Sequence, residues 1–439
     1  MYDAIIIGAR VSGAPTAMLL ARKGYRVLLL DRATFPSDTV STHMITVQGS
    51  AQLKKWGLLG QIQASGCPAV THIELDVEFE RYGRFQLTGF PYADAEGFAA
   101  IYAPKRTVLD KILVDAAVAA GADVREGFTV QEVLIENGRV VGISGRGASG
   151  LTVTEHARIV IGADGLHSLV AKTVGATKYH VAPPKAFGYY TYWDDVELRG
   201  LEFYTRPGST VIAFPTHDNQ AAVFVERPER DFADFKTDIH AKYLDTVTGI
   251  APDLGERLRS GRLAHRFMGA GMRENFFRRP HGPGWALVGD AGVHKDPITA
   301  QGITDGFRDA DLLALAVDAG FSGRMPLDSA LRQYEYRRNQ ALKPLYDFIV
   351  DHAAMEPFEP AFQDVLAAMR GNQDAINHFF GVIQNTVPWE EFFSPENLSA
   401  IMARAEQGAP AADVPVADPA AADTPAELER QPSLAGAVG

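Results

Sequence analysis

Apolar and polar residues follow two distinct patterns along this chain of 439 residues. In the first pattern, short apolar runs near residues 5, 28, 160 and 287 each end at a glycine or an aspartate. Continuous apolar runs of this length predict strands that are buried on both faces, as in a parallel sheet. Between the first two runs, helical apolar spacing from Ala14 to Lys23 predicts a helix that stops at Gly24. The four runs therefore predict one parallel sheet whose carboxyl ends converge on a crevice.

The second pattern places apolar residues near every other position and predicts antiparallel strands. It covers residues 73–99 and 186–267, where a helix near 232–246 interrupts the strands. The longer stretch is rich in aromatic residues, which suits a sheet that packs against a neighbouring layer. We expect this sheet to form one wall of a pocket, with the parallel sheet on the other side.

Helical spacing and turn signals organise the remaining segments. Thr107 and Asp110 can cap a helix over residues 107–120, and Asn137-Gly138 predicts a hairpin turn between strands near 124–134 and 140–144. A disordered tail is expected at the end, because large apolar residues are almost absent after Val416. This disordered tail is expected to cover residues 406–439. Before it, three amphipathic helices are expected over residues 304–318, 328–354 and 359–384.

The composition is that of a globular protein, with 46% hydrophobic and 22% charged residues. A net charge of −12 without any basic run argues against nucleic acid or an anionic membrane as the main partner. The single cysteine, Cys67, excludes an intrachain disulfide and is expected to be a small buried thiol. The first strand begins at residue 2 and no run of about 18 apolar residues occurs, so we expect neither a signal peptide nor a membrane span. The cytoplasm is the expected location.

Glycines after the first strand indicate a nucleotide-binding turn. Gly8 and Gly13 occupy the outer positions of the G-x-G-x-x-G pattern, in which backbone N–H groups face a pyrophosphate, although Arg10 replaces the middle glycine. Asp31 ends the second strand at about the 20-residue separation of a carboxylate that binds a ribose hydroxyl. These features favour a dinucleotide site over a βαβ unit that binds nothing, with Arg10 adding charge near the pyrophosphate.

Two later strands end in aspartate motifs that can reach the same ligand. Gly162-Ala-Asp164-Gly165 follows one strand, and the alternative interpretation of Asp164 is a turn residue that caps the next helix. Gly289-Asp290 follows the last apolar run and leads into a turn rich in proline and glycine. Because parallel strands end at one edge of a sheet, these motifs and the first glycine turn predict a single extended ligand.

The ordered motifs resemble those of the FAD-dependent monooxygenases of the p-hydroxybenzoate hydroxylase type. These are group A flavoproteins, in the superfamily that includes geranylgeranyl reductases and flavin halogenases. The resemblance covers roughly residues 2 to 350. It implies an α/β fold with a Rossmann-like FAD-binding domain, a substrate domain built on a mixed or antiparallel sheet, and C-terminal helices. The implied segments are 1–72, 100–185 and 268–325 for FAD, 73–99 and 186–267 for the substrate sheet, and 326–405 for the helices.

The resemblance also implies roles for residues at matching positions. Gly8 and Gly13 would belong to the pyrophosphate turn, and Asp31 would bind the adenosine ribose. Arg106 would contact the flavin phosphate and ribityl region, and Asp290 the ribityl chain. The full implied cofactor set is Gly8, Arg10, Gly13, Asp31, Arg32, Arg106, Val130, Asp164, Gly165, Asp290, Pro297 and Gly302.

The activity implied by the resemblance is hydroxylation of an aromatic or hydrophobic small molecule. In such enzymes NADPH or NADH reduces the flavin, and O₂ then gives a C4a-hydroperoxide that hydroxylates the substrate. Two alternatives stay open: a flavin reductase of C=C bonds that resembles geranylgeranyl reductase, and a non-catalytic flavin-binding or partner-binding protein. Halogenation is less favoured because the sequence has no Trp-x-Trp-x-x-Pro segment. The sequence does not indicate the oligomeric state.

Candidate substrate-side residues lie in loops at the ligand end and on the aromatic strand. Histidine titrates near working pH and can accept a proton from a phenol or an amine. A plainer interpretation is a histidine that only hydrogen-bonds the backbone, or an aspartate that caps a helix. No metal site is expected, because the twelve histidines lack metal-ligand spacing. The candidate catalytic residues are His43, His294 and Asp296, and the candidate substrate contacts are Tyr190, Tyr192 and His217, with sheet packing as the alternative for the tyrosines.

Overall fold

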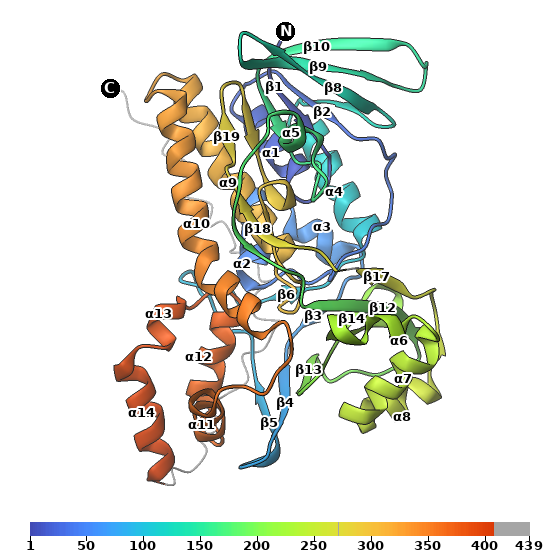
Figure 1. The fold of residues 1–439 in the computed structure, drawn as a ribbon, viewed down its shortest axis with the longest axis vertical. Helices are drawn as coiled ribbons and strands as arrows, with labels where there is room; N and C mark the ends of the chain where they lie inside the picture. Colours follow the sequence, from blue (N-terminus) through green and yellow to red (C-terminus); the bar gives the residue numbers. More distant parts are fainter. Residues whose placement is uncertain (271, 408–439) are drawn as a thin grey trace, which may run out of the picture.

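The computed structural model describes residues 1–270 and 272–407, so nearly all of the tail that we expected to be disordered lies outside the described residues. Two units, each built on a large sheet, form the upper and lower halves of the view in Figure 1. The long helix α10 (Leu327–His352) runs down one side of the molecule and reaches from the first unit to the second (Figure 1).

The first unit contains the parallel sheet that the apolar runs predict. Its strand order is β19-β20-β10-β1-β2-β7, and all neighbours from β20 to β7 pair in parallel. The four apolar runs are therefore neighbours in one sheet, which confirms the prediction. The strands are β1 (Tyr2–Ile7), β2 (Val27–Leu30), β7 (Asp123–Arg125), β10 (Thr152–Gly162), β19 (His281–Gly282) and β20 (Trp285–Leu287).

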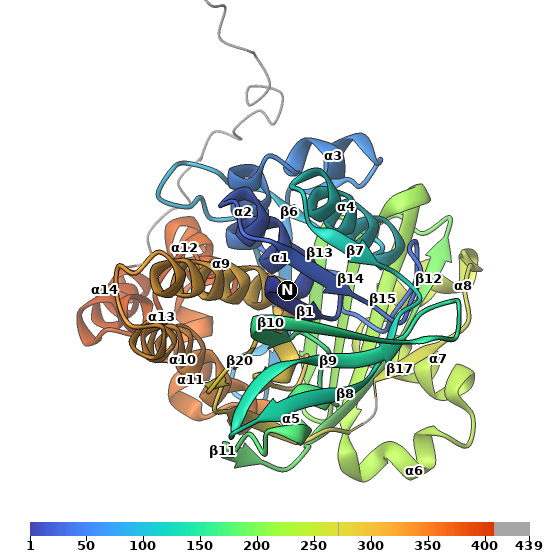
Figure 2. The same cartoon turned by 90° about the horizontal axis from the view of Figure 1, so that it is seen from above.

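Both faces of this sheet are covered, which explains why its strands are continuously apolar. Ala4 and Ile6 of β1 pack into a core formed with α1, α4 and α9. Ile5 and Ile7 point to the other face, where the β8–β9 hairpin and α5 complete a second core (Figure 2). The covering elements are α1 (Gly13–Arg22), α4 (Arg106–Ala119), α5 (Leu169–Thr173), α9 (Gly302–Phe321), β8 (Thr129–Glu136) and β9 (Arg139–Arg146).

Two local predictions for this unit need correction. The strand expected over residues 124–134 is divided at Gly127, which has a φ of +63°, so that β7 joins the parallel sheet and β8 pairs with β9 instead. The cap expected from Thr107 and Asp110 is wrong, because α4 begins at Arg106 and no side chain caps it. The hairpin turn at Asn137-Gly138 is confirmed by left-handed φ angles of 49° and 76°.

The second unit contains the strands that the alternating pattern predicts. Its strand order is β16-β12-β15-β14-β13-β4-β5, with β17 beside β12, and only the β13–β4 pair is parallel. Because β17 (Met268–Ala270) pairs with β12, this unit extends beyond the boundary expected at residue 267. The other strands are β4 (Ile73–Phe79), β5 (Gly83–Gly89), β12 (Ala186–Asp194), β13 (Leu201–Arg206), β14 (Ser209–Thr216), β15 (Gln220–Pro228) and β16 (Arg262–Leu263).

The two faces of the second sheet meet different partners. Val223 and Val225 of β15 pack with Tyr243 in a core under the helices of residues 232–260. Ala222 and Phe224 point to the opposite face, into a core shared with the C-terminal helices. The single helix expected near 232–246 is instead three helices, namely α6 (Phe232–Phe235), α7 (Ile239–Ile250) and α8 (Pro252–Ser260).

The expected C-terminal helices are present, with one of them divided, and two further helices follow them, α13 (Trp389–Phe392) and α14 (Pro395–Glu406). The helix expected over residues 359–384 is divided into α11 (Pro360–Ala368) and α12 (Gln373–Ile383), because Gly371 adopts a φ of +76° and Asn372 caps α12. None of the helices in residues 1–270 and 272–407 is long and apolar enough to cross a membrane. The remaining elements used below are α2 (Val47–Trp56), β18 (Asn275–Arg278), β21 (Val293–His294) and the short turn η3 (Gly289–Ala291).

Cys67 is buried, as expected for a thiol with a packing role. Burial raises the pKa of this thiol to about 12, so the thiolate is scarce at neutral pH. The prediction of a small, buried thiol is therefore confirmed.

Candidate cofactor and substrate site

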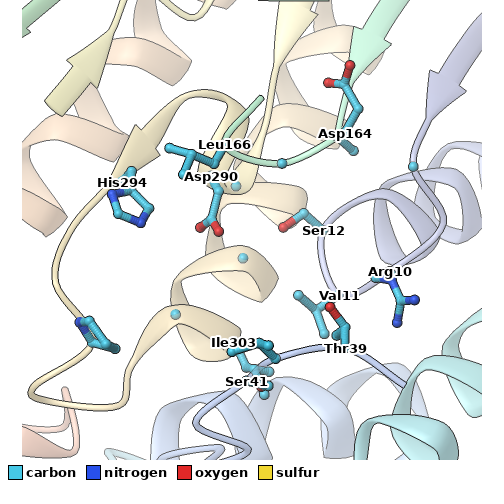
Figure 3. A pocket seen from close by; sticks show the side chains of 18 of the residues that line it. Arg10, Val11, Ser12, Thr39, Ser41, Asp164, Leu166, Asp290, His294 and Ile303 are labelled. Atoms are coloured by element: carbon cyan, nitrogen blue, oxygen red, sulfur yellow. The ribbon is translucent and has the colours of Figure 1, made fainter. Parts of the chain in front are cut away.

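A cavity of about 860 Å³ opens at the carboxyl ends of the parallel strands (Figure 3). Residues that end or directly follow β1, β2, β10 and β20 line it, so the four apolar runs converge on one crevice. Every residue of the implied cofactor set except Gly13 lines this cavity. They are Gly8, Arg10, Asp31, Arg32, Arg106, Val130, Asp164, Gly165, Asp290, Pro297 and Gly302.

The glycine turn is packed too tightly for side chains. Gly8 adopts a φ of +101°, and a Cβ there would lie 2.3 Å from the carbonyl oxygen of Ala163 at the end of β10. A Cβ on Gly13 would lie 1.7 Å from the carbonyl oxygen of Gly8. Gly13 therefore lies beneath the turn rather than in the cavity, and it allows α1 to begin directly against the strand ends.

Asp31 joins the end of β2 to the glycine turn. Its Oδ2 accepts a hydrogen bond from the backbone N–H of Ala9 at 2.7 Å, and its Oδ1 accepts one from Ala33 at 2.8 Å. These two bonds fix the carboxylate at the edge of the cavity, next to Arg32. This is the place that the resemblance implies for a ribose ligand.

Arg10 and Arg106 share a carboxylate that the sequence analysis assigned to a helix cap. Asp110 is fully buried; its Oδ2 accepts a hydrogen bond from Arg10 Nη1 at 2.5 Å, and its Oδ1 accepts one from Arg106 Nη2 at 2.9 Å. The guanidinium of Arg10 also donates to the carbonyl oxygen and the hydroxyl of Ser37. Asp110 thus holds two cations at the cavity wall, and spacing along one helix could not show that Arg10 would meet it.

The two aspartate motifs differ in where their carboxylates point. The Asp164 carboxylate turns away from the cavity and accepts a hydrogen bond from the Leu169 N–H at 2.6 Å in the first turn of α5, although the N-cap residue of that helix is Ser168. Its buried Oδ1 has no hydrogen-bond partner among the described residues, and burial raises its pKa. The Asp290 carboxylate, from η3, points into the cavity toward Ser12 (Figure 3). Asp290 is therefore the motif aspartate whose carboxylate faces the cavity.

Ser12 connects three segments that the sequence analysis treated separately. A Cβ on Gly289 would lie 2.3 Å from the Ser12 hydroxyl oxygen, and a Cβ on Gly306 would lie 2.7 Å from it. The glycine turn, η3 and α9 therefore meet around this small side chain. Gly306 lies inside a helix and could have indicated this contact from the sequence, because a glycine within a helix commonly marks a place where another segment packs closely against it.

His294 and Asp296 both line the cavity. Nδ1 of His294 lies 2.8 Å from the carbonyl oxygen of Glu274 and donates a hydrogen bond to it. Asp296 is buried and accepts a hydrogen bond from Nδ2 of Asn275 at 2.9 Å, while burial raises its pKa. The capping alternative for Asp296 is wrong, because α9 begins at Gly302 with Gln301 as its N-cap.

His43 and Tyr192 do not line this cavity. His43 is fully buried, and its Nε2 forms a short hydrogen bond with the Tyr192 hydroxyl. Burial, together with the nearby charge of Arg106, lowers the pKa of His43 to about 3, so its ring is neutral at neutral pH. The structure therefore puts this pair behind the cavity wall and gives no support to a proton-transfer role for His43.

Tyr190 and His217, which we expected together, lie in different places. Tyr190 lines the cavity, stacks on Phe224 with ring centroids 4.4 Å apart, and accepts a hydrogen bond from the Ser41 N–H at 3.3 Å. His217 lies outside the cavity lining: its Nδ1 accepts a hydrogen bond from the Lys105 N–H at 3.2 Å, just before α4. The geometry therefore supports a substrate contact for Tyr190 and a structural role for His217.

Glu226 is a cavity residue that the sequence analysis missed. It lies on β15, lines the cavity and is only 2% exposed. Burial and the nearby charge of Asp296 raise its pKa to about 8. The sequence could have indicated this position, because side chains alternate between the two faces of a strand and Glu226 therefore lies on the same face as Ala222 and Phe224.

A second cavity of about 830 Å³ lies between the second sheet and the C-terminal helices. Its lining is mainly apolar and includes Phe203 of β13, Phe348 of α10 and Phe380 of α12. Ile298 and Thr299 also line it, whereas the preceding Pro297 lines the first cavity. The turn before α9 therefore lies between the two cavities.

A protein-family model described as "FAD binding domain" matches residues 1–349. The chain belongs to this family of FAD-binding proteins. It is accordingly an FAD-dependent oxidoreductase, and FAD is its cofactor. The resemblance to FAD-binding flavoproteins is confirmed by this family model, and the curated relatives include geranylgeranyl reductases.

Individual relatives agree with this assignment. A digeranylgeranylglycerophospholipid reductase of Methanocella arvoryzae is 26% identical over 311 residues, which covers 69% of this chain and 74% of the relative. The flavin-dependent brominase Bmp2 superposes with a TM-score of 0.76 at 16% identity, covering 93% of this chain and all of the brominase. PqsL of P. aeruginosa, solved with 2-aminobenzoylacetate, superposes with a TM-score of 0.66 at 19% identity. The match covers 86% of this chain and 99% of PqsL. At these identities the solved structures establish the shared fold.

The first cavity fits an FAD molecule. The 20-residue helix α9 begins at Gly302, where a Cβ would meet nothing within 4 Å, so the positive end of the helix opens into the cavity. A cavity-facing carboxylate at Asp290 and the tightly packed glycine turn complete a set of groups suited to ribityl hydroxyls and phosphates. No cluster of His, Cys, Asp and Glu that could hold a metal ion occurs in residues 1–270 and 272–407.

Proposed function

We propose that this protein is an NAD(P)H- and O₂-consuming monooxygenase that hydroxylates an aromatic or hydrophobic small molecule. The observation that carries the proposal is the cavity wall formed by Tyr190 and Phe224, which stack on each other in the same cavity as Pro297 and Gly302. An aromatic wall beside the expected position of the flavin ring suits an apolar substrate. The second, mainly apolar cavity across the Pro297–Thr299 turn adds room for such a molecule.

The residues of this chain would hold the cofactor, exclude water and orient the substrate. When bound, FAD supplies the electron transfer and the activation of oxygen. Gly8 and Asp31 would bind the dinucleotide end of the cofactor, and Asp290 the ribityl chain. His294 lines the cavity with its Nδ1 bonded to the backbone of Glu274, so its Nε2 is left to take a proton from a substrate hydroxyl or amine in this proposal. The buried sheet face would keep bulk water away from the reacting atoms.

The reductant is proposed to be NADH or NADPH. The sequence contains only one glycine-rich nucleotide fingerprint, at Gly8 to Gly13. We therefore expect the nicotinamide cosubstrate to bind transiently and leave after it has reduced the flavin, rather than to occupy a dinucleotide domain of its own.

Reduction of C=C bonds in an isoprenoid is the second candidate function. It is favoured by the similarity to a digeranylgeranylglycerophospholipid reductase over 69% of this chain. The two candidates differ in their need for oxygen, because a reductase would yield a saturated product under anaerobic conditions.

The test is a screen of purified holoenzyme for NAD(P)H consumption with aromatic and isoprenoid compounds, in air and under anaerobic conditions. A monooxygenase is expected to consume O₂ and give a product that has gained one oxygen atom. A saturated product without oxygen uptake would establish the reductase instead. Bound flavin that NAD(P)H never reduces, with or without any compound, would contradict both activities.

A further inference from the structure

Glu226 is a buried acid whose Oε2 is left without a partner in the part of the chain that the structure describes. Its side chain projects from β15 into the first cavity, and its residue is 2% exposed. Oε2 is fully enclosed and has no hydrogen-bond partner among the described residues. A buried carboxyl without a partner is costly, so such a group in a cavity wall commonly has a function.

The residues opposite Glu226 on the neighbouring strands carry no charge and cannot form an ion pair with it. Its cross-strand neighbour on β12 is Gly188, which has no side chain, and its neighbour on β14 is Thr210. Glu226 and Gly188 line the first cavity, whereas Thr210 lines the second. Glu226 therefore stands where the two cavities approach each other on one face of the sheet.

The charged groups on the surrounding segments do not neutralise Glu226. Asp296, after β21, is another buried acid, and its side chain is bonded to Asn275. Lys185, before β12, donates to the carbonyl oxygen of Val350 at 2.7 Å, and Nδ1 of His294 is bonded to the backbone of Glu274. The exposed Arg273 also lines the cavity but forms no ion pair with Glu226. His294 and Lys185 act on the charge of Asp296, whereas Glu226 forms no ion pair with any of the described residues.

We propose that Glu226 binds a basic amine on the substrate, so that the natural substrate is an amphiphilic amine with an apolar body. The apolar body would lie against Tyr190 and Phe224 and extend toward the second cavity. This inference rests on the proposed function, because it identifies the substrate class of the same site. An ammonium group would supply both the charge and the hydrogen-bond donors that the carboxylate lacks, whereas an anionic ligand would be repelled by the neighbouring acid.

The protonation state of Glu226 makes the inference measurable. Burial and the charge of Asp296 raise its pKa to about 8, so the free enzyme carries a protonated Glu226 at neutral pH. Binding an ammonium ion favours the carboxylate form and releases the proton. Amine affinity should therefore rise between pH 6 and pH 8, and it should fall again at higher pH as the amine itself loses its charge.

The experiment compares 4-phenylbutylamine with 4-phenylbutan-1-ol, a neutral molecule of similar shape. Binding to the oxidised holoenzyme is followed by perturbation of the flavin absorbance at pH 8, for the native enzyme, Glu226→Gln and the control Glu229→Gln. Glu229 is an exposed residue that directly follows β15, so Glu229→Gln makes the same side-chain substitution outside the cavity. We expect the native enzyme and Glu229→Gln to prefer the amine by about tenfold, and Glu226→Gln to lose that preference.

Two results would overturn the inference: equal binding of amine and alcohol by the native enzyme, or a preference for the amine that survives in Glu226→Gln. If that variant does not retain FAD, calorimetry on the native enzyme at pH 7 in two buffers of different ionisation enthalpy decides the question. Proton release on amine binding supports the inference, and its absence contradicts it. These measurements require no turnover, so they are independent of whether the product gains oxygen.

Discussion

Arg10 and Asp110 are separated by 100 residues and form an ion pair at the wall of the cofactor cavity, with Nη1 and Oδ2 2.5 Å apart. The aspartate side chain has no exposed surface, and Arg106 donates to its other oxygen. The arginine that departs from the glycine-rich pattern is therefore tied to the helix α4 rather than free to move toward a phosphate. Its charge reaches the cavity from a fixed position.

Replacing Asp110 with alanine is expected to destabilise the protein strongly, because it leaves two guanidinium groups without their shared carboxylate. Removing one partner of a buried ion pair typically costs about 3 to 5 kcal/mol. Chemical denaturation of the holoenzyme should show a loss of this order in the free energy of unfolding. Asp115→Ala is the control, because it removes an exposed ion pair with Lys111 on the same helix and should cost less than about 0.5 kcal/mol. Equal effects of the two substitutions would contradict the structural role of Asp110.

Gly13→Ala is expected to abolish FAD binding. The added Cβ would lie 1.7 Å from the carbonyl oxygen of Gly8, so the glycine turn or the start of α1 must move. Overpacking of this kind typically costs about 1 to 3 kcal/mol and displaces the N–H groups that face the ligand. Flavin content after purification and FAD titration of the apoprotein measure the effect. Gly249→Ala, in α7, is the control, because its Cβ would meet nothing within 4 Å. A Gly13→Ala protein with native flavin content would refute the packing argument.

Asp290→Ala is expected to weaken FAD binding without unfolding the protein, because this exposed carboxylate points into the cavity. Loss of one hydrogen-bonded contact should raise the dissociation constant by an amount equivalent to about 1 to 3 kcal/mol. Fluorescence quenching of FAD by the apoprotein measures it. Asp347→Ala removes an exposed carboxylate that pairs with Lys343 on α10, and it should leave FAD binding unchanged. An unchanged dissociation constant for Asp290→Ala would disprove its role as a ligand to the ribityl chain.

The raised pKa of Glu226 predicts a pH dependence of stability. The pKa is about 8 in the folded protein, against an ordinary value of 4.5, so the folded state binds more protons than the unfolded state between these values. The free energy of unfolding should therefore fall as the pH rises from about 5 to 8, by at most about 4 to 5 kcal/mol from this group. Glu226→Gln removes this contribution.

Denaturation of native and Glu226→Gln holoenzymes at pH 5.5 and pH 8.5 tests the prediction. Relative to the native enzyme, the variant should be more stable at pH 8.5 than at pH 5.5. A stability difference that does not change with pH would show that Glu226 titrates near its ordinary pKa.

Local sequence determined the parallel sheet and the position of its ligand edge. Continuous apolar runs require burial on both faces, and glycines at positions such as Gly8 require a turn without side chains. Both requirements depend on residues that are close together in the sequence. The sequence alone therefore predicts the buried strands and the turn between them. The same holds for the alternating strands of the second sheet. Left-handed turns at Gly127 and Gly371, however, divide a strand and a helix that the periodicity predicted as continuous elements.

Only the tertiary structure decided which polar side chains reach the cavity. His43 and His294 are the same residue type in similar loops, yet one is buried behind Tyr192 and the other lines the cavity. Asp110 suited a helix cap by spacing, but it pairs with Arg10 from a distant turn. The physical reason is that a side chain's exposure, charge state and partners depend on which segments pack across it. Those contacts join residues far apart in the chain, where local periodicity carries no information.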